Sequence, residues 1–296
     1  MTARFRLTMA TQCGEKLARD EGYSAFPVNP IDIARKRDIH VEKKPPEMKG
    51  ISGALIFAEP NPIIIYSTEH ANEGFENFSV AHELGHYFLP GHPEEIQRAG
   101  GAHMSRSGFS EGDSSIEIEA DHFAAGLLMP DYLVLKTLMS GQVGLGGIRQ
   151  LAEQAGASLT AAAIRAAQCA QFPLCIIVSG GEAVAYAFPS EKFKDLGRNI
   201  YLRKGSALAV GSATAALNAR PSDVLAAMEM TGECQLTDWF DTDRNATLDE
   251  EVVGLGKYGL TLTVLSSEPL ALQDDDEEDE EAALEASWTP RFAYGR

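Results

Sequence analysis

Residues 80–86 read VAHELGH, with two histidines four positions apart and a glutamate directly after the first. A helix with about 3.6 residues per turn places His82 and His86 one turn apart on one face, where both can bind a single metal ion. Catalytic zinc sites use neutral imidazoles, keep three protein ligands and leave one position for water. The pattern therefore predicts half of a catalytic zinc site, with Glu83 placed to act as a base.

The flanking residues predict that this motif lies on a short, largely buried helix. Phe75 and Phe78 precede it, Asn77 is a candidate N-cap, and the Pro-Gly pair at residues 90–91 is a helix stop. Histidines on a buried helix need polar partners, because an unpaired buried polar group is costly. This context favours the metal-site interpretation over two histidines on an exposed helix surface.

A third ligand is expected from residues 114–130, SSIEIEADHFAAGLLMP, which predict a second helix. Glu117 and Asp121 share one face of it, and Glu119 points about 200° away from Glu117. We predict Glu117 as the ligand, because Asp121 can then accept the outer N–H of a zinc-bound histidine. Two alternatives stay open: Glu119 is the ligand instead, or Glu117 closes a capping box with Ser114.

The two motifs together resemble the ImmA/IrrE family of bacterial metallopeptidases, whose pattern is HELGH followed by a glutamate-bearing helix that ends in FAA-x-LLMP. Segments upstream at residues 27–34, 53–56 and 63–66 fit the family's order of helix, strand and strand. The resemblance covers about residues 10–135. It implies an α+β fold with a small zincin-like peptidase core, built around the HExxH helix and the glutamate-bearing helix.

The resemblance also implies a function. His82, His86 and Glu117 would bind Zn²⁺, and Glu83 would be the catalytic acid/base of a zinc-dependent endopeptidase. The family cleaves helix-turn-helix transcriptional repressors and thereby induces stress or mobile-element responses, so we expect an XRE-type repressor, on a separate polypeptide, as substrate. The alternative is a non-proteolytic regulatory binding protein of a two-gene stress or toxin–antitoxin pair.

Amide hydrolysis at such a site needs a group that stabilises the oxyanion. Four side chains near the motifs are candidates, of which His103 is the strongest: His92, His103, His122 and Tyr87. Extended substrates of peptidases add a strand to an exposed sheet edge, and the strand-like segments 53–58 and 62–67 are candidates either for that edge or for the sheet interior.

Composition limits the remaining possibilities. A chain of 296 residues with 44% hydrophobic content buries a real core and favours two domains. It contains neither an apolar run long enough to cross a membrane nor the apolar core of a signal peptide, so we expect a cytoplasmic protein without a membrane partner. Four cysteines without a CxxC pair indicate neither a disulfide framework nor a thiolate zinc site.

Charge argues against direct binding to nucleic acid. The formal net charge is -18, whereas broad binding to phosphates needs lysine and arginine. Residues 148–167 resemble a helix-turn-helix, but only Arg149 and Arg165 in them could reach phosphate, which favours a packed helical subdomain. The acidic run at residues 274–281 is expected to be a solvated linker, and the aromatic, basic segment 287–296 is a candidate docking tail.

We predict four regions along the chain: a zinc metallopeptidase domain at 1–135, a helical, helix-turn-helix-like subdomain at 136–170, a C-terminal α+β domain at 171–270, and an acidic linker and tail at 271–296. Residues 91–113 are expected to form a long loop near the site. In the C-terminal domain we expect strands at 174–178, 183–187 and 260–265, with helices at 207–217 and 222–230. In some relatives the corresponding domain is a sensory, GAF-like module.

Overall fold

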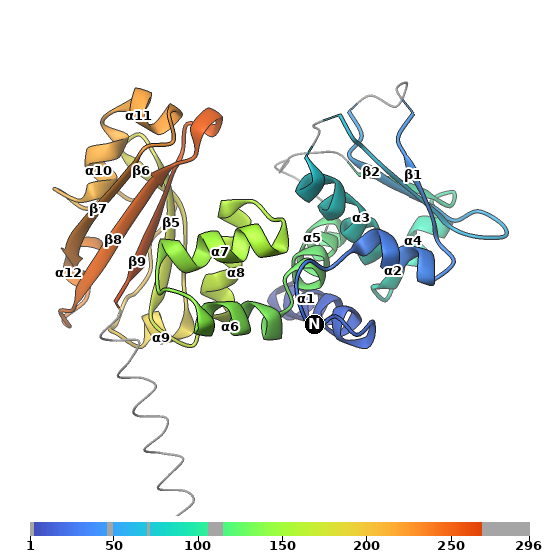
Figure 1. Cartoon of the computed structure of the whole chain (residues 1–296), viewed down its shortest axis with the longest axis horizontal. Coiled ribbons are helices and arrows are strands. Elements are labelled where there is room, and N and C mark those ends of the chain that lie inside the picture. Colours follow the sequence, from blue (N-terminus) through green and yellow to red (C-terminus); the bar gives the residue numbers. More distant parts are fainter. Residues whose placement is uncertain (1–2, 46–49, 70–71, 106–114, 268–296) are drawn as a thin grey trace, which may run out of the picture. The chain divides into compact units, whose positions relative to one another are not determined.

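The structure is a computed structural model that describes residues 3–45, 50–69, 72–105 and 115–267. It divides into two compact units, one within Met1–Ser140 and Ile148–Arg165, the other within Gly141–Gly147 and Ala166–Arg296. Both combine helices with a sheet (Figure 1), which confirms the predicted α+β class. The acidic run at 274–281 and the segment 287–296 lie outside the described residues.

The first unit contains a four-stranded sheet and a group of helices. Its sheet has the order β1-β3-β2-β4, in which β1 and β3 are parallel and the other pairs antiparallel. The elements that lie entirely in this unit are α1 (Ala3–Asp20), α2 (Pro30–Lys36), β1 (His40–Lys43), β2 (Gly53–Ile56), β3 (Ile63–Tyr66), α3 (Glu73–Phe88), α4 (His92–Arg98), β4 (Ala102–Ser105), α5 (Ser115–Leu128) and α6 (Asp131–Ser140).

Helix α3 carries the HELGH motif and begins earlier than expected. Its N-cap is Asn72, whose side chain accepts a hydrogen bond from the backbone N–H of Phe75, so the prediction of Asn77 as N-cap is wrong. Leu89 ends the helix in an extended conformation, and Gly91, with φ +93°, turns the chain into α4. The predicted long loop at 91–113 is therefore wrong in part, because it contains α4 and β4.

Helix α5 packs against α1 and α3 with almost no side chain between the backbones. A Cβ on Gly126 would lie 2.2 Å from the carbonyl oxygen of Thr11, and one on Gly14 would lie 2.2 Å from that of Phe123. On the other side, a Cβ on Gly85 would lie 3.1 Å from the Cα of Ala120. Glycine at these positions brings α5 close enough to α3 for their polar side chains to meet.

The helix-turn-helix-like region consists of α7 (Leu145–Ala155) and α8 (Leu159–Cys169). Arg165 on α8 is buried, donates through Nε to the backbone oxygen of Met129 over 2.8 Å, and pairs with Glu15. A guanidinium bound in this way cannot reach phosphate. Arg165, one of the two arginines that a DNA-binding interpretation needs, is therefore not available to bind DNA.

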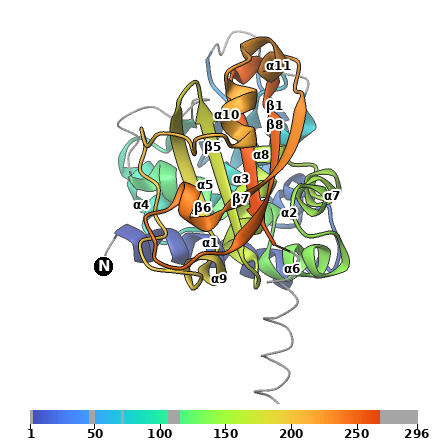
Figure 2. The same cartoon turned by 90° about the vertical axis from the view of Figure 1, so that its left-hand side faces the viewer.

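The second unit is built on a five-stranded antiparallel sheet of order β6-β5-β9-β8-β7. Helix α10 lies against its β7–β8–β9 face (Figure 2). The elements of this unit are β5 (Leu174–Gly180), β6 (Ala183–Pro189), α9 (Glu191–Lys194), α10 (Ala213–Asn218), α11 (Pro221–Leu225), β7 (Glu229–Gln235), α12 (Leu236–Trp239), β8 (Thr247–Gly254), the 3-10 helix η1 (Gly256–Tyr258) and β9 (Thr261–Ser266).

In this unit the predicted strand hairpin is confirmed, whereas the predicted lengths of the helices are wrong. The β5–β6 hairpin turns at Gly181, which has φ +57°, and β9 agrees with the expected late strand at 260–265 except that it is shifted by one residue toward the C-terminus. The helices predicted at 207–217 and 222–230 are too long, because α10 starts only after its N-cap Ser212 and β7 begins at Glu229. None of the described helices is long and apolar enough to span a membrane.

Candidate metal centre

Helix α3 presents the first part of the site from its buried face. His82 is 7% exposed, and Glu83 and His86 are both 0% exposed. The Nε2 atoms of the two histidines lie 3.1 Å apart. Two ligands held about 2.0–2.1 Å from a tetrahedral zinc ion are separated by about 3.3 Å, so this spacing suits one shared ion.

Helix α5 adds a carboxylate to the same point. The oxygens of Glu117 lie 3.4 Å from Nε2 of His82 and 3.3 Å from Nε2 of His86. The structure therefore brings the three predicted ligands together. Ser114, the other half of the alternative capping box, lies outside the described residues.

Strand β4 contributes a fourth donor, His103, whose Nε2 lies 2.9 Å from Oε1 of Glu117. Among the described residues, His82, His86, His103 and Glu117 form a group in which each offers one ligand atom and all four atoms lie within 4.8 Å of one another. Nε2 of His103 and Oε1 of Glu117 are buried and make no hydrogen bond in this geometry. Orphaned donor atoms that converge on one point, from imidazole and carboxylate groups, fit a divalent metal ion such as zinc.

Protonation of these side chains also suits a metal. Burial by itself would raise the pKa of Glu117, but its close contacts with His103, His82 and His86 hold that pKa far below its usual range, so the carboxylate is ionised. Burial lowers the pKa of His86 to about 3, so its imidazole is neutral. For His82, hydrogen bonds to Asp121 and Glu117 overcome the effect of burial and raise the pKa to about 10. The metal-free site thus holds a proton on His82 that a metal ion would displace.

Asp121 lies behind His82. Its Oδ1 is 2.8 Å from Nδ1 of His82. A carboxylate only accepts, so Nδ1 carries a proton and Nε2 is the nitrogen directed to the metal site. Asp121 therefore orients the ring of His82 and selects its tautomer.

Glu83 is held away from the group of four donors, against the sheet. Its Oε1 accepts a hydrogen bond of 2.7 Å from the hydroxyl of Ser105, while Oε2 is buried without a partner among the described residues. Gly53 on β2 makes room for it, because a Cβ there would lie 2.5 Å from Oε1. Burial raises the pKa of Glu83 above its usual value, although His82 and Ser105 partly oppose the rise. A carboxylate with a raised pKa and one free oxygen suits a proton acceptor.

Glu119, the alternative ligand, points to the other side of α5. Arg6 on α1 binds both of its oxygens at 2.9 Å, and His92 lies 3.4 Å from one of them. It is 3% exposed and does not belong to the group of metal donors. The 200° separation expected from helix geometry accounts for this placement.

The other oxyanion candidates lie outside the group of four. Nδ1 of His122 is 3.2 Å from the hydroxyl of Thr11, Tyr87 stacks on Phe57 with ring centroids 6.1 Å apart, and His92 contacts the back of His86. The interval from His86 to His92 matches the spacing in the HExxHxxGxxH motif of one class of zinc peptidases, with leucine in the glycine position. That signal marks His92, but the structure places it behind a ligand.

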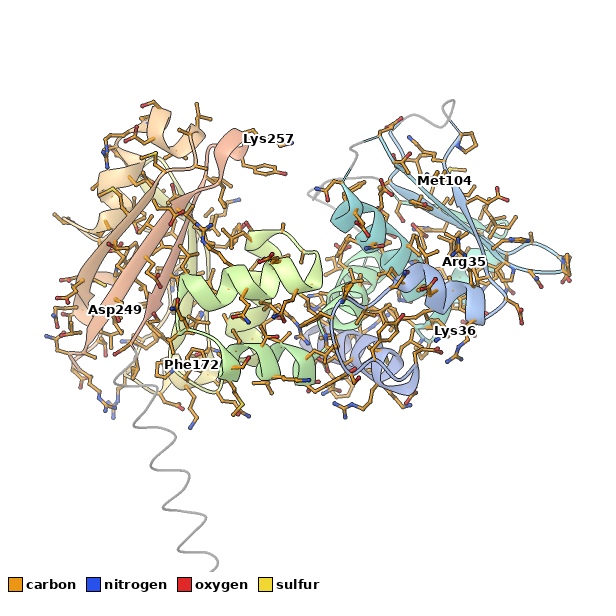
Figure 3. All side chains as sticks on the ribbon, viewed as in Figure 1. Arg35, Lys36, Met104, Phe172, Asp249 and Lys257 are labelled. Atoms are coloured by element: carbon orange, nitrogen blue, oxygen red, sulfur yellow. The ribbon has the colours of Figure 1, made fainter. Side chains whose placement is uncertain are left out.

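Strand alternation explains how β4 serves the site. His103 and Ser105 are two residues apart and face inward, whereas Met104, labelled in Figure 3, is 54% exposed. Strands β2 and β3 are interior, so the alternative that they form the sheet edge is wrong; the edges are β1 and β4. The edge strand nearest the donors is therefore β4, which sequence reasoning missed.

Comparison with known proteins agrees with this geometry. Residues 34–167 match the family model Peptidase_M78, described as the IrrE N-terminal-like domain. Over these residues the chain is similar to the M78 family. The match confirms the resemblance to the ImmA/IrrE family and supports a metallopeptidase-type function for the M78 domain.

A solved structure shares the fold over most of the chain. It is a Mycobacterium tuberculosis transcriptional regulator, 13% identical in sequence, with a TM-score of 0.54 over 87% of this chain and 76% of that one. At this identity the likeness concerns the fold alone. No curated protein matches the sequence significantly.

Proposed function

We propose that this protein is a zinc-dependent endopeptidase that cuts one peptide bond in a specific protein, a helix-turn-helix transcriptional repressor of the XRE type. The observation that carries the proposal is the pairing of a metal-binding group, His82, His86 and Glu117, with a separate buried carboxylate, Glu83, that has one unpartnered oxygen. A structural metal site needs only the first of these features. Hydrolysis needs both.

The residues have distinct parts in the reaction. His82, His86 and Glu117 would hold zinc, which when bound lowers the pKa of a water and polarises the scissile carbonyl. Oε2 of Glu83 accepts the proton of the attacking water and passes it to the leaving amine. Ser105 and Gly53 keep Oε1 of Glu83 occupied and fixed, so that Oε2 is the oxygen that exchanges protons.

His103 is the group in this arrangement that suits the developing oxyanion. It reaches the donors from β4 rather than from the two ligand helices, and an extended substrate paired with the edge of β4 would pass beside it. The hydrolysis we propose takes place in the cytoplasm, where the repressor is found. The C-terminal unit would supply substrate recognition or signal input.

One observation favours a second candidate function. If His103 binds the metal as a fourth protein ligand, the site has no open position and resembles a structural zinc site. The protein would then be a non-proteolytic regulatory partner of a two-gene stress or toxin–antitoxin pair. In both functions the partner is a protein and not nucleic acid.

Cleavage of the helix-turn-helix repressor encoded beside this gene separates the two functions. The native protein and Glu83→Gln are loaded to equal zinc content and incubated with the repressor, and products are mapped by mass spectrometry. Cleavage by the native protein alone, abolished by a chelator and restored by zinc, is the expected result. Binding by both proteins with cleavage by neither would favour the regulatory function.

A further inference from the structure

A chain of buried polar side chains runs away from His86 on the side opposite the metal donors. Nδ1 of His86 lies 3.2 Å from Nδ1 of His92, and Nε2 of His92 lies 3.4 Å from Oε2 of Glu119. Arg6 then binds Glu119 with two contacts of 2.9 Å, from Nη2 to Oε2 and from Nε to Oε1. His86 and His92 are 0% exposed and Glu119 is 3% exposed.

The donor and acceptor chemistry gives this chain a direction. Arginine only donates, and Arg6 donates to both oxygens of Glu119, so each of these oxygens acts as an acceptor. Nε2 of His92, facing that carboxylate, therefore carries a proton. A neutral, buried His92 then has a bare Nδ1, which accepts from Nδ1–H of His86. The proton of His86 is thereby fixed on Nδ1, and its Nε2 lone pair faces His82 and Glu117.

We propose that Arg6, Glu119 and His92 are positioning residues that hold His86 in its metal-binding tautomer. The inference rests on the metal site of the proposed function. Asp121 fixes the tautomer of His82 by a direct contact, whereas Glu119 fixes the tautomer of His86 through the intervening imidazole of His92. The two glutamates of the EIE sequence then have complementary tasks: Glu117 faces the metal site, and Glu119 faces the back of a ligand.

Helix α1 becomes part of the metal centre through this chain. Arg6 lies outside the residues 34–167 that match the family model, yet its guanidinium binds both oxygens of Glu119 and orients that carboxylate. A merely structural role would be an ion pair that joins α1 to α5. That role predicts changes in stability alone, and the positioning role predicts changes at His86.

The experiment compares His92→Leu with His92→Asn, whose amide oxygen can occupy the place of Nδ1 and accept from His86. His122→Leu, which removes a half-buried histidine elsewhere in the same unit, is the control. Two readouts are used: the tautomer of His86 from ¹⁵N NMR of the metal-free protein, and the zinc dissociation constant from competition with a chelator.

We expect the Nδ1–H tautomer at His86 in the native protein, in His92→Asn and in His122→Leu. His92→Leu should give a mixture of tautomers and bind zinc about 10–100-fold more weakly. Glu119→Gln, which preserves side-chain volume, should change both readouts in the same direction and serves if His92→Leu does not fold. Neither readout requires peptide hydrolysis, so failure of the proposed protease activity leaves this test intact.

Two results would overturn the proposal. An unchanged tautomer and zinc affinity in both His92→Leu and Glu119→Gln, with a lower unfolding temperature, would make the chain a structural link between helices. The absorption spectrum of the cobalt-substituted protein reports the coordination number of the metal. If His92→Leu changes that number, His92 is a metal ligand and not a positioning residue.

Discussion

The hydroxyl of Ser105 donates a hydrogen bond to Oε1 of Glu83 over 2.7 Å, and both side chains are buried. This contact ties the edge strand β4 to helix α3, whose sequences are about twenty residues apart. It determines which oxygen of Glu83 remains free. The ionisation of Glu83 therefore depends on a residue that is neither a predicted metal ligand nor, in the proposed mechanism, a substrate contact.

Ser105→Ala should move the acid limb of the pH–rate profile to higher pH. The hydrogen bond from Ser105 lowers the pKa of Glu83, so its loss raises that pKa further and leaves less of the ionised base at any given acidic pH. A hydrogen bond to a charged group is worth about 1.5–3 kcal/mol, which corresponds to a shift of about one pH unit or more. Measuring the rate of repressor cleavage from about pH 5 to about pH 9 covers the acid limb and tests this prediction.

The control is Ser79→Ala. It removes a buried hydroxyl on α3 that donates a hydrogen bond to the backbone carbonyl of Phe75 and not to Glu83. It should leave the acid limb in place. A profile of Ser105→Ala that coincides with that of the native protein would show that Ser105 does not tune Glu83.

Gly53→Ala should lower kcat at least about tenfold while zinc content stays the same. The new Cβ would lie 2.5 Å from Oε1 of Glu83 and would push the carboxylate out of place, and misplacement by about 1 Å costs roughly 100-fold. Gly232→Ala is the matched control, since its Cβ would meet only the Cβ of Ala213 at 3.4 Å. Full activity in Gly53→Ala would mean that the position of Glu83 tolerates displacement.

His103→Gln distinguishes an oxyanion contact from a fourth metal ligand. We expect kcat to fall about 100- to 1,000-fold, as for loss of an oxyanion donor, with little change in zinc affinity. Zinc competition assays and single-turnover cleavage measure the two quantities separately. A large loss of zinc affinity would instead identify His103 as a ligand and support the regulatory function.

Arg165→Met should destabilise the first unit by about 3 kcal/mol. The change removes the hydrogen bond to Met129 and leaves Glu15 without its buried partner. Urea unfolding followed by circular dichroism measures the loss, with Arg149→Met, at an exposed position on α7, as control. Because Arg165 is buried, its replacement should not alter retention on duplex DNA, and a specific loss of retention in Arg165→Met would revive the DNA-binding interpretation.

His122 should make the fold sensitive to mild acid. Burial, assisted by Arg165, lowers the pKa of His122 from its ordinary value of 6.5 in the folded state. Below pH 6.5 the unfolded chain therefore binds a proton that the folded chain does not, and stability falls as pH drops toward the folded-state pKa. His122→Gln should lose less stability than the native protein between about pH 7 and pH 5. Urea unfolding at several pH values measures this. If the native protein and His122→Gln lose the same stability across this range, His122 does not cause the acid sensitivity.

Helix periodicity made the centre of the site predictable. The interval from His82 to His86, and that from Glu117 to Asp121, fix which side chains share a face whatever the rest of the chain does. The same local logic placed Glu119 away from Glu117. These inferences need only the geometry of one helix.

Contacts made by strand pairing were not predictable in this way. His103 reaches the donors because β4 pairs with β2, where His103 lies opposite Leu55, a partner nearly fifty residues away. Nothing in a four-residue strand specifies that register. In the second unit, Glu250 interrupts the apolar pattern of β8 because its buried carboxylate accepts hydrogen bonds from the first turn of α10, so the strand was missed.

The glycine contacts between α1 and α5 mean that the boundary of a sequence family is not the boundary of a folding unit. A fragment cut to residues 34–167 would keep every predicted zinc ligand, yet it would strip α1 from Gly126 and Phe123 and open the apolar interior of the domain to water. Such a fragment would also lose Arg6. Anyone who expresses this domain alone should include α1, because the matched segment packs on this helix although the match begins only at residue 34.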